Sequence, residues 1–506
     1  MTTALWIAIV GQVLMGAFDT FFHHEATERL AWRPSQVVEL RLHGLRNLAY
    51  GAMFLILGWM RLSGAPAILL LVLMTCELGI TLWDFVEEDR TRHLPASERI
   101  THTLLALNFG AILAWIVPLL LAGIRLPAAP AFHGLVSWFC LLAALIVAIF
   151  GLRDLAAARR CRRLGPSDPA ALAAALGPIP QSILVTGGTG FIGRRLVAAL
   201  VAAGHEVTVL TRRSGAEPPM PIRMITHLDQ LGNHTGIDVI VNLAGEPIAT
   251  GLWTLARRRR ILASRLRITR QLTKLIARLD RKPALLISGS AIGWYGIRRD
   301  ERLDEHARGR PCFSRTLCLA WEEAARVAES MGVRTVRLRI GLVLGTDGGM
   351  LGRMLMPFEF GLGGRFGNGQ QWMSWIHRDD LVRLIVHCMA TPALHGPVNA
   401  VAPIPVRNAE FTRMLARALR RPAWIPIPAL PLHLLLRDMA DELLLGGQCV
   451  IPTAALESGF VYRFPKLDAA LQDLMGAAGK PRLARPKSAN AATPRRSRLP
   501  EPVAPY

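Results

Sequence analysis

Ser182-Ile-Leu-Val-Thr186, followed at once by Gly187-Gly-Thr-Gly190-Phe-Ile-Gly193, decides the fold of the larger part of this chain. The first five residues form a short apolar run typical of a buried strand, and the residues after the last glycine have a helical pattern. Strand, glycine loop and helix therefore follow one another in the order that a dinucleotide site requires. Gly187 allows the tight turn, Gly190 lets a pyrophosphate approach the backbone, and Gly193 lets the helix pack closely on the strand.

The residues after this unit repeat the alternation of strand and helix. Short apolar runs predict further strands, and longer amphipathic stretches between them predict helices. The pattern predicts a Rossmann-type, doubly wound parallel sheet. The predicted strands are Glu206 to Leu210, Asp238 to Asn242, Ala284 to Ser288 and Val333 to Leu338, and the clearest helices are Arg257 to Leu279 and Leu319 to Met331.

The end of the second strand indicates which dinucleotide is bound. An NAD site carries Asp or Glu about 20 residues after the glycine loop, to bind the ribose hydroxyl. Here Arg212 and Arg213 stand at that place, and Arg194 follows the loop. These charges suit a 2′-phosphate, so NADP(H) is the preferred cofactor, with NAD as the alternative and solvated surface charge as the plain explanation of the arginines. The remaining predicted cofactor contacts are Phe191, Ile192, Asn242, Ala244 and Gly245.

The N-terminal region has a different character. Segments of about 20 mostly apolar residues match the thickness of a bilayer core. The first segment resembles a signal peptide in length, but it lacks a basic start and is followed by more spans, so a transmembrane helix is preferred. An all-α transmembrane bundle of about five helices is predicted, with spans at Ala4 to Phe22, Leu45 to Leu62, Ala67 to Val86, Thr103 to Gly123 and Phe132 to Leu152.

Arginines in the loops predict the orientation of this bundle. They concentrate between the first two spans, between the third and fourth spans, and after the fifth span. By the positive-inside rule these parts are cytoplasmic. We therefore predict a multi-pass protein of the inner membrane with its nucleotide-binding domain in the cytoplasm. The basic run after the fifth span is expected to contact anionic lipid head groups, and no nucleic acid partner is expected.

Composition agrees with this division of the chain. Of the 506 residues, 51% are hydrophobic and 19% charged, with a net charge of +22, which excludes a disordered acidic chain. The 7 cysteines include no C-x-x-C pair and favour a reducing compartment. The predicted domains are a transmembrane region at 1–152, a basic linker at 153–180, a Rossmann domain at 181–398, a small substrate lobe at 399–478 and a disordered basic tail at 479–506.

Several further stretches carry a family resemblance. They include Asn242-Leu-Ala-Gly-Glu-Pro247, Ser288-Gly-Ser-Ala-Ile-Gly-Trp-Tyr-Gly296 and Ser374-Trp-Ile-His-Arg-Asp-Asp380. With the glycine loop, these residues resemble an extended, atypical short-chain dehydrogenase/reductase of the bacterial "epimerase family", which is similar to NAD-dependent epimerases and dehydratases. The resemblance covers about Ser182 to Leu474 and implies a parallel-sheet nucleotide-binding core with a small C-terminal substrate lobe.

The resemblance leaves the chemistry open. The wider superfamily uses a Tyr and a Lys four positions later as a proton-transfer pair, and Phe313 and Leu317 stand at the corresponding places here. Ser290 lies where the superfamily's catalytic Ser is expected. Tyr295 is the nearest phenol. We predict these two residues as catalytic, while a purely structural role in the Trp-Tyr-Gly turn is the alternative for Tyr295.

The membrane region also holds unusual polar residues. Glu77 and Asp84 lie seven residues apart on one helix face, and ionisable groups at such depth usually meet a partner. His23, His24 and His102 gather near the cytoplasmic ends. A metal or quinone site is one interpretation, but the spacings match no di-iron or haem pattern. Ion pairing, for instance of Arg46 with Asp84, is preferred, and no metal is predicted.

Three functions follow from these observations. The first is a membrane-anchored NAD(P)-dependent oxidoreductase or epimerase that acts on a small molecule. That molecule could be a lipidic substrate that the bundle presents to the active site. The second is an NADP(H)-sensing regulatory protein without turnover. The third is a membrane redox or transport module controlled by a nucleotide-binding domain. The sequence favours the first, and it identifies neither the substrate nor the oligomeric state.

Overall fold

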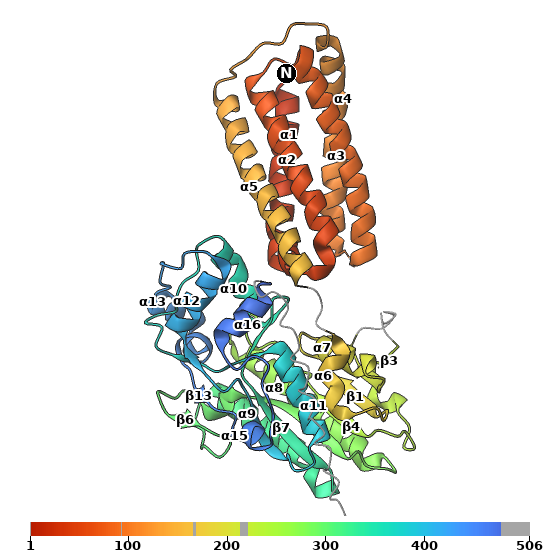
Figure 1. Ribbon diagram of the computed structural model, residues 1–506, viewed down its shortest axis with the longest axis vertical. Helices are drawn as coiled ribbons and strands as arrows, with labels where there is room; N and C mark the ends of the chain where they lie inside the picture. The colour runs from red at the N-terminus through yellow and green to blue at the C-terminus, as the bar shows by residue number, and fades with distance from the viewer. Residues whose placement is uncertain (1, 93, 165–167, 213–220, 477–506) are drawn as a thin grey trace, which may run out of the picture.

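A helical bundle stands on an α/β domain in the computed structural model, which describes residues 2–92, 94–164, 168–212 and 221–476 (Figure 1). The predicted tail at 479–506 lies outside the described residues.

The α/β domain is built on a seven-stranded parallel sheet. In the strand order β3-β2-β1-β4-β5-β7-β11, β1 is the third strand, and the order in which strands are added to the sheet reverses between β1 and β4, as in a doubly wound fold. The prediction of a Rossmann-type sheet is confirmed. The strands are β1 (Ser182–Thr186), β2 (Glu206–Leu210), β3 (Arg223–Ile225), β4 (Val239–Asn242), β5 (Leu285–Ala291), β7 (Arg334–Ile340) and β11 (Gly396–Ala400).

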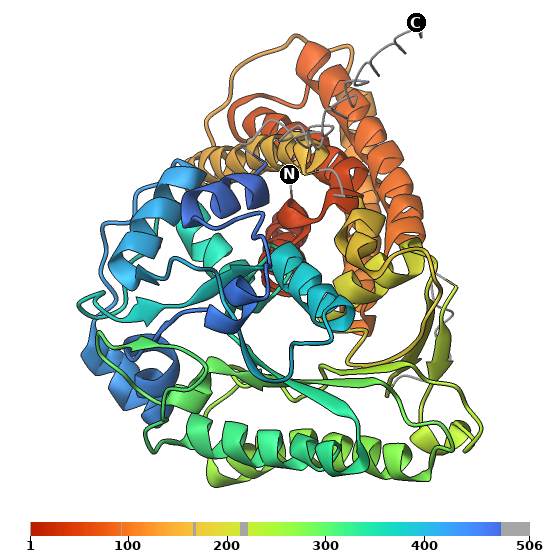
Figure 2. The same cartoon turned by 60° about the horizontal axis from the view of Figure 1, so that its bottom comes forward.

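Helices cover both faces of the sheet (Figure 2). Side chains alternate along a strand, so those of β1 point to opposite faces of the sheet. Ile183 and Val185 pack against the helices on one face, and Leu184 packs against the helices on the other. Both faces of the central strands are therefore buried, which explains their unbroken apolar runs. One face carries α6 (Pro169–Ala173), α7 (Gly193–Ala202) and α11 (Arg378–Ala390), and the other α8 (Leu255–Arg278) and α9 (Phe313–Arg326).

A smaller lobe lies at the carboxyl end of the sheet. It contains three short strand pairs, β8 (Leu342–Leu344) with β10 (Trp375–His377), β9 (Trp372–Met373) with β12 (Val406–Arg407), and β6 (Arg302–Leu303) with β13 (Cys449–Val450). Its helices are α10 (Gly349–Glu359), α12 (Asn408–Leu419), α13 (Ala429–Leu436), α14 (Asp438–Ala440), α15 (Thr453–Glu457) and α16 (Leu467–Leu474). The lobe therefore draws on residues before β11 as well as on the predicted C-terminal segment.

The bundle consists of five long helices. They are α1 (Thr3–Phe18), which continues as the π-helical segment η1 (Asp19–Glu28), α2 (Val37–Trp59), α3 (Gly64–Thr91), α4 (Ala96–Gly123) and α5 (Leu135–Arg163). Four of the five, all but α2, are long and apolar enough to cross a membrane. Their outer faces expose large apolar side chains such as Leu14, Leu82, Leu107 and Leu121. The expectation of membrane association is supported by this composition.

Helix α2 differs from the predicted second span. It begins at Val37, not near Leu45, and its first half carries Glu39, Arg41, His43 and Arg46. These charges lower its hydropathy, and neighbouring helices bury many of its residues. Gly44, Gly51 and Gly58 face α5 so closely that a Cβ at Gly58 would lie 2.6 Å from the Cβ of Cys140. Small residues thus allow α2 and α5 to pack tightly.

Helix α5 joins the bundle to the α/β domain. It runs unbroken to Arg163, so the first part of the predicted linker at 153–180 is helical. Arg153 and Arg160 both bind the carboxylate of Glu359 at the end of α10, with N–O distances of 2.7 and 3.0 Å. The guanidinium of Arg160 also lies 3.5 Å from the ring centre of Trp32. These two arginines therefore contact protein, where the sequence had suggested lipid head groups.

Glu359→Gln is expected to weaken this joint. The carboxylate offsets two partly buried guanidinium groups, and its loss leaves Arg160 without an acidic partner among the described residues, while Arg153 keeps Glu25. We expect the free energy of unfolding to fall by about 2 kcal/mol, measured by thermal unfolding in detergent. Asp438→Asn, in an exposed pair with Arg258, is the control and should cost well under about 1 kcal/mol. Equal effects of the two substitutions would contradict a structural role for Glu359.

Candidate functional site

The glycine loop between β1 and α7 has the backbone that a phosphate requires. Gly187 has a φ of +72°, which favours glycine, and a Cβ there would lie 2.8 Å from the carbonyl carbon of Leu243. At Gly190, a Cβ would meet only the carbonyl oxygen of Gly187, at 3.1 Å, so the space beyond the loop is open. Among the described residues, no side chain caps the N-terminus of α7. The start of this helix therefore borders the loop without a competing side chain, an arrangement that suits an anion.

Gly193 makes the closest approach in the loop. A Cβ at this position would lie 2.1 Å from the carbonyl oxygen of Gly187 and 2.7 Å from the Cα of Gly188. The ring of Phe191 packs closely on Gly345 and Gly348, in the loop before α10, where a Cβ would collide with it. The predicted residue Ile192 is the N-cap of α7. The loop is thus held from both sides by backbone.

The end of β4 supports the loop from beneath. Thr186 donates a hydrogen bond to the side-chain oxygen of Asn242 over 2.7 Å, and the Asn242 amide nitrogen donates to Thr269 over 3.0 Å. The amide of Ala244 donates to the Thr186 hydroxyl, and Gly245 lies against the guanidinium of Arg265. The Asn242 side chain is therefore fully engaged inside the protein, and it positions the strand ends that border the site.

Positive charge lies beside the loop. Arg194 is exposed and comes within 3.8 Å of Asp347, and Arg212, exposed at the end of β2, interacts electrostatically with Glu246 after β4. A hydrogen bond from Arg257, together with Arg212, holds the pKa of the Glu246 carboxyl below its ordinary value. Both predicted arginines thus lie on the carboxyl side of the sheet. Arg213 lies outside the described residues.

A cavity of about 220 Å³ opens between the strand ends and the small lobe. Its walls are mostly apolar, and the polar groups among them are few. An apolar pocket with a small number of polar groups is the usual form of a small-molecule site. The lining includes Leu317, Trp321, Ile340, Met350, Trp372 and Leu443, with Arg265, Ser314, Cys318 and Glu442 among its polar members.

Ser314 is the polar residue of this cavity with the clearest capacity to bind a ligand. It is buried, and its hydroxyl has no hydrogen-bond partner among the described residues. Glu442 accepts hydrogen bonds from the amides of Phe313 and Ser314, which fixes the start of α9 beside the cavity. Burial raises the pKa of the Cys318 thiol to about 12, so this thiol stays neutral. Sequence reasoning missed Ser314, because a lone Ser at a helix start is usually a cap.

Behind the cavity wall lies a continuous buried polar network. Ser290 donates to Glu322 over 2.7 Å, and Arg339 binds both oxygens of Glu322 at 2.9 and 3.1 Å. Arg339 also donates to the hydroxyl of Tyr295 over 3.1 Å. That hydroxyl donates to Asn399 over 2.7 Å. Burial raises the pKa of the Tyr295 phenol to about 12, so it remains protonated at neutral pH.

The two predicted catalytic residues both belong to this network. Ser290 and Tyr295 are brought together through Glu322 and Arg339. Their neighbours Ala291, Ile292 and Gly293 are among the residues that line the cavity, whereas Ser290 and Tyr295 are not among its described lining residues. The Tyr295 side chain is fully buried. The catalytic assignment stays a prediction. In this arrangement each hydroxyl already has a protein partner.

Tyr295→Phe distinguishes a structural role of the phenol from a catalytic one. It removes one donated and one accepted hydrogen bond, so we expect the free energy of unfolding to fall by about 1–2 kcal/mol. Chemical denaturation and NADPH turnover should be measured on the same preparation, with Tyr462→Phe as a second buried phenol for comparison. A large loss of turnover at unchanged stability would contradict the structural role and identify Tyr295 as the proton donor.

His377 and Asp380 lie at the start of α11, and their side chains have different partners. The structure makes His377 the N-cap of α11, where its ring accepts a hydrogen bond from the amide of Asp379. The Asp380 carboxylate accepts hydrogen bonds from the amides of Arg463 and Phe464 and thereby holds the C-terminal segment to α11.

Comparisons with known proteins agree with this architecture. Residues 183–401 match the model of the NAD dependent epimerase/dehydratase family, and residues 427–474 match a domain of unknown function. The chain is 39% identical over 304 residues to the chloroplastic homolog of epimerase family protein SDR39U1 from Arabidopsis thaliana, covering 58% of this chain and 87% of that protein. It is 35% identical to epimerase family protein YfhF of Bacillus subtilis, with 58% and 98% covered.

A solved structure extends the similarity to three dimensions. The crystal structure of human epimerase family protein SDR39U1 (isoform 2) with NADPH is 37% identical, with a TM-score of 0.54, and covers 58% of this chain and 99% of that one. The resemblance inferred from the motifs is thereby confirmed. Through its α/β domain and small lobe, the chain belongs to the NAD dependent epimerase/dehydratase family, on the branch of the epimerase family proteins.

Proposed function

We propose that this protein is a membrane-anchored, NADP(H)-dependent oxidoreductase or epimerase that acts on a small apolar molecule. The observation that carries the proposal is the glycine loop, open at Gly190 and next to Arg194 and Arg212, on the carboxyl side of the same sheet as an apolar cavity. The human relative that was crystallised with NADPH supports the choice of cofactor.

The residues present fit a dinucleotide phosphate. Gly187, Gly190 and the uncapped start of α7 would hold the pyrophosphate, and Arg212 with Arg194 would hold a 2′-phosphate. When bound, the nicotinamide supplies hydride transfer. The protein's own part is to exclude water from the reacting atoms with apolar walls such as Trp321 and Leu317, and to hold a polar end of the substrate with Ser314.

The membrane bundle gives this activity a location. Apolar outer faces on four candidate spans support insertion in a membrane, and the arginine-rich loops support a cytoplasmic position for the α/β domain. Because α10 of the lobe lines the cavity through Met350 and also binds α5 through Glu359, the cavity lies close to the bundle. A lipidic substrate that enters from the membrane side is consistent with this arrangement.

Arg212→Glu tests the preference for the phosphorylated cofactor. It replaces a charge that would pair with the 2′-phosphate by one that repels it, while NADH has no group at that place. We expect NADPH affinity to fall about 10- to 100-fold, and NADH affinity to change by less than about threefold. Cofactor fluorescence on titration measures both, and Arg223→Glu, on β3 of the same sheet, is the control. Equal losses for both cofactors would contradict the assignment of Arg212.

An NADP(H)-sensing protein without turnover is the second candidate. It is favoured by Leu317, an apolar residue that lines the cavity near where the superfamily's proton-transfer pair would act. Assays of NADPH consumption in the presence of apolar aldehydes, ketones and quinones distinguish the two functions. Turnover that falls when Ser314 is replaced by Val supports the enzyme. Saturable NADPH binding with no consumption in these assays would favour the sensor.

A further inference from the structure

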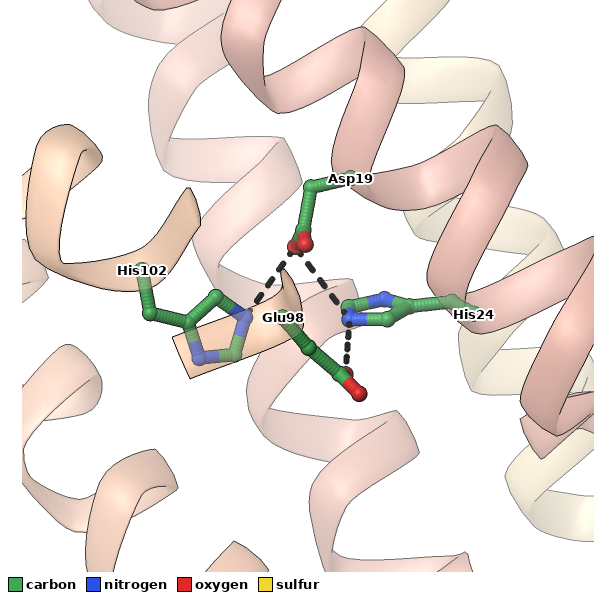
Figure 3. Close-up of side chains that lie close together, drawn as sticks. All are labelled: Asp19, His24, Glu98 and His102. Carbon is green, nitrogen blue, oxygen red and sulfur yellow. Dashed lines mark hydrogen bonds and ion pairs between the residues drawn. The ribbon is translucent and has the colours of Figure 1, made fainter. Parts of the chain in front are cut away.

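Three buried side chains, Asp19, His24 and Glu98, and the partly buried His102 converge within the bundle (Figure 3). Asp19 and His24 come from η1, and Glu98 and His102 from the first turns of α4. One ligand atom from each lies within 4.8 Å of all the others. Two elements that are distant in sequence therefore bring two imidazoles and two carboxylates to one point.

The distances between these atoms match a coordination sphere. His24 Nε2 lies 3.3 Å from Asp19 Oδ2 and 3.6 Å from Glu98 Oε1, and His102 Nε2 lies 3.2 Å from Asp19 Oδ2. Four ligands placed about 2.1 Å from a metal at the corners of a tetrahedron are separated by about 3.4 Å. An ion at the centre of the four atoms would thus bind with small adjustments of side chains.

The π-helical segment η1 explains why Asp19 and His24 meet. Residues five apart point in different directions on an α-helix but share a face when the turn is widened. The switch from α1 to η1 occurs at Asp19, at the start of the cluster. Such widened turns are unusual and occur most often at functional sites.

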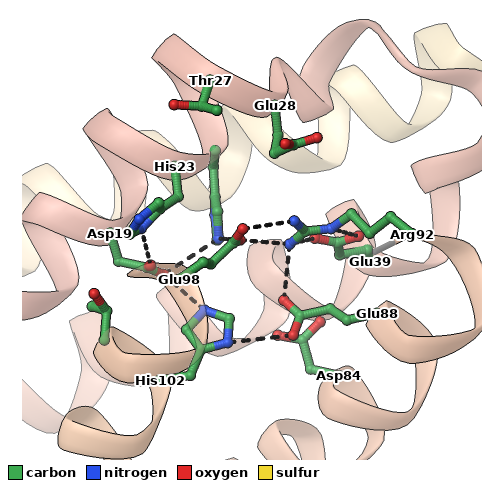
Figure 4. Close-up of polar contacts among 12 residues, drawn as sticks. Asp19, His23, Thr27, Glu28, Glu39, Asp84, Glu88, Arg92, Glu98 and His102 are labelled. Atoms are coloured by element: carbon green, nitrogen blue, oxygen red, sulfur yellow. Dashed lines mark hydrogen bonds and ion pairs between the residues drawn. The ribbon is translucent and has the colours of Figure 1, made fainter. Parts of the chain in front are cut away.

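A second layer of contacts fixes the ligands (Figure 4). His23 binds the other oxygen of Asp19 over 2.9 Å, which turns Oδ2 toward the site. The second ring nitrogen of His102 lies 3.4 Å from Glu88 Oε2, and Arg92 donates to Glu98 over 2.7 Å. A carboxylate behind a ligating histidine is a regular feature of metal centres.

Some of these polar atoms are buried without a good partner. His24 Nε2 and Glu88 Oε2 make no hydrogen bond among the described residues, although His24 is 6% exposed and Glu88 0%. A buried nitrogen without a hydrogen-bond partner destabilises an apolar bundle. Five of the buried carboxylates of the bundle lie in this cluster, namely Asp19, Glu39, Asp84, Glu88 and Glu98. Among the described residues, their arginine partners are Arg46 and Arg92, and their other ion-pair partners are histidines. A divalent cation would offset the excess of negative charge.

A second group, His24, Glu39, His43 and Glu88, shares one histidine with the first. Its carboxylates are already bound by Arg92, which lies 2.9 Å from Glu39 and 3.2 Å from Glu88. Arg92 also binds both oxygens of Glu98, at 2.7 and 2.9 Å, so it contacts one of the four residues of the first group and two of the four residues of the second. The first group is therefore the less occupied by arginine and is the better candidate for a metal ion.

We propose that Asp19, His24, Glu98 and His102 bind one divalent first-row transition-metal ion, of the Zn²⁺, Fe²⁺ or Mn²⁺ class. Two imidazole ligands select these ions over Mg²⁺ and Ca²⁺, which prefer oxygen. The proposal revises the expectation from the sequence, which favoured ion pairing alone. The site is independent of the proposed dinucleotide site. It is linked to the lobe through Glu25, whose carboxylate binds Arg153, the partner of Glu359.

Cobalt binding tests this proposal. Full-length protein without a polyhistidine tag is purified in detergent, dialysed against a chelator and titrated with Co²⁺, which reports imidazole and carboxylate ligands by its visible absorption. We expect one equivalent to bind, and Zn²⁺ to displace it. His24→Ala and Glu98→Gln should each weaken binding at least about 100-fold. Glu77→Gln, a buried carboxylate held by Tyr50 and Thr81 in the same bundle, is the matched control and should leave binding unchanged.

The other outcomes would overturn the site. Absence of stoichiometric Co²⁺ on the wild-type protein would leave ion pairing as the full account. Metal that persists in His24→Ala and Glu98→Gln would show that it binds elsewhere. Elution as a single detergent-solubilised species and the near-ultraviolet circular dichroism of the bundle tryptophans verify folding. If His24→Ala fails this check, His102→Gln takes its place, and retention of Co²⁺ by that folded variant contradicts the proposal.

Discussion

Arg339→Met is expected to lower the free energy of unfolding by about 3–5 kcal/mol, the largest loss of stability that we predict for a single substitution in the α/β domain. The guanidinium is 3% exposed and binds both oxygens of Glu322, the hydroxyl of Tyr295 and the backbone oxygen of Glu305. Its removal leaves the buried carboxylate of Glu322 without its bidentate partner. Chemical denaturation of the full-length protein in detergent measures the loss.

Two controls show whether the buried charge is the cause. Arg281→Met breaks an exposed pair with Asp238 and should cost less than about 1 kcal/mol. The double variant Arg339→Met, Glu322→Gln removes both charges together and should recover part of the loss. If Arg339→Met costs no more than Arg281→Met, the network does not stabilise the domain as described.

Gly193→Ala is expected to abolish cofactor binding. The new Cβ would lie 2.1 Å from the carbonyl oxygen of Gly187, and backbone atoms on both sides leave no flexible group that can move away. The loop must therefore open, and several phosphate contacts are lost together. We expect NADPH affinity to fall at least about 100-fold, since each charge-assisted hydrogen bond contributes about 1.5–3 kcal/mol.

Gly236→Ala is the matched control for this substitution. A Cβ at Gly236 would meet only the end of the Arg281 side chain, at 3.4 Å, and that side chain can move. Its NADPH affinity should stay within about twofold of the wild-type value. Isothermal titration gives both constants, and thermal unfolding shows whether the domain still folds. Retained NADPH affinity in folded Gly193→Ala would contradict the placement of the phosphates.

The glycine loop and the sheet could be predicted because their signals are local. A buried parallel strand must be apolar on both faces, and the tight turn after β1 admits only glycine at certain positions. Both constraints appear in the order of residues along the chain. The Arg46 and Asp84 ion pair, predicted from depth and charge, is also confirmed, at 3.0 Å.

The remaining features depend on contacts between distant residues. Glu322 receives hydrogen bonds from Ser290 and Arg339, which lie on two different strands. The helical spacing of α9 places Glu322 on the buried face, but it does not show which groups meet its carboxylate. The docking of Glu359 against Arg153 brings together residues from the lobe and the bundle. The π-helical turn at Asp19 changes which residues share a face, so an α-helical projection separates Asp19 from His24. These arrangements follow from packing and have no local signal.

The most direct test of the proposed function is titration of the purified full-length protein, in detergent, with NADPH and separately with NADH. We predict saturable binding of one NADPH per chain, with NADH at least about tenfold weaker. Gly190→Asp, which places a negative charge where the pyrophosphate would lie, should lose both cofactors, and Arg212→Glu should lose chiefly NADPH. Absence of binding of either cofactor to the folded protein would contradict the proposed function.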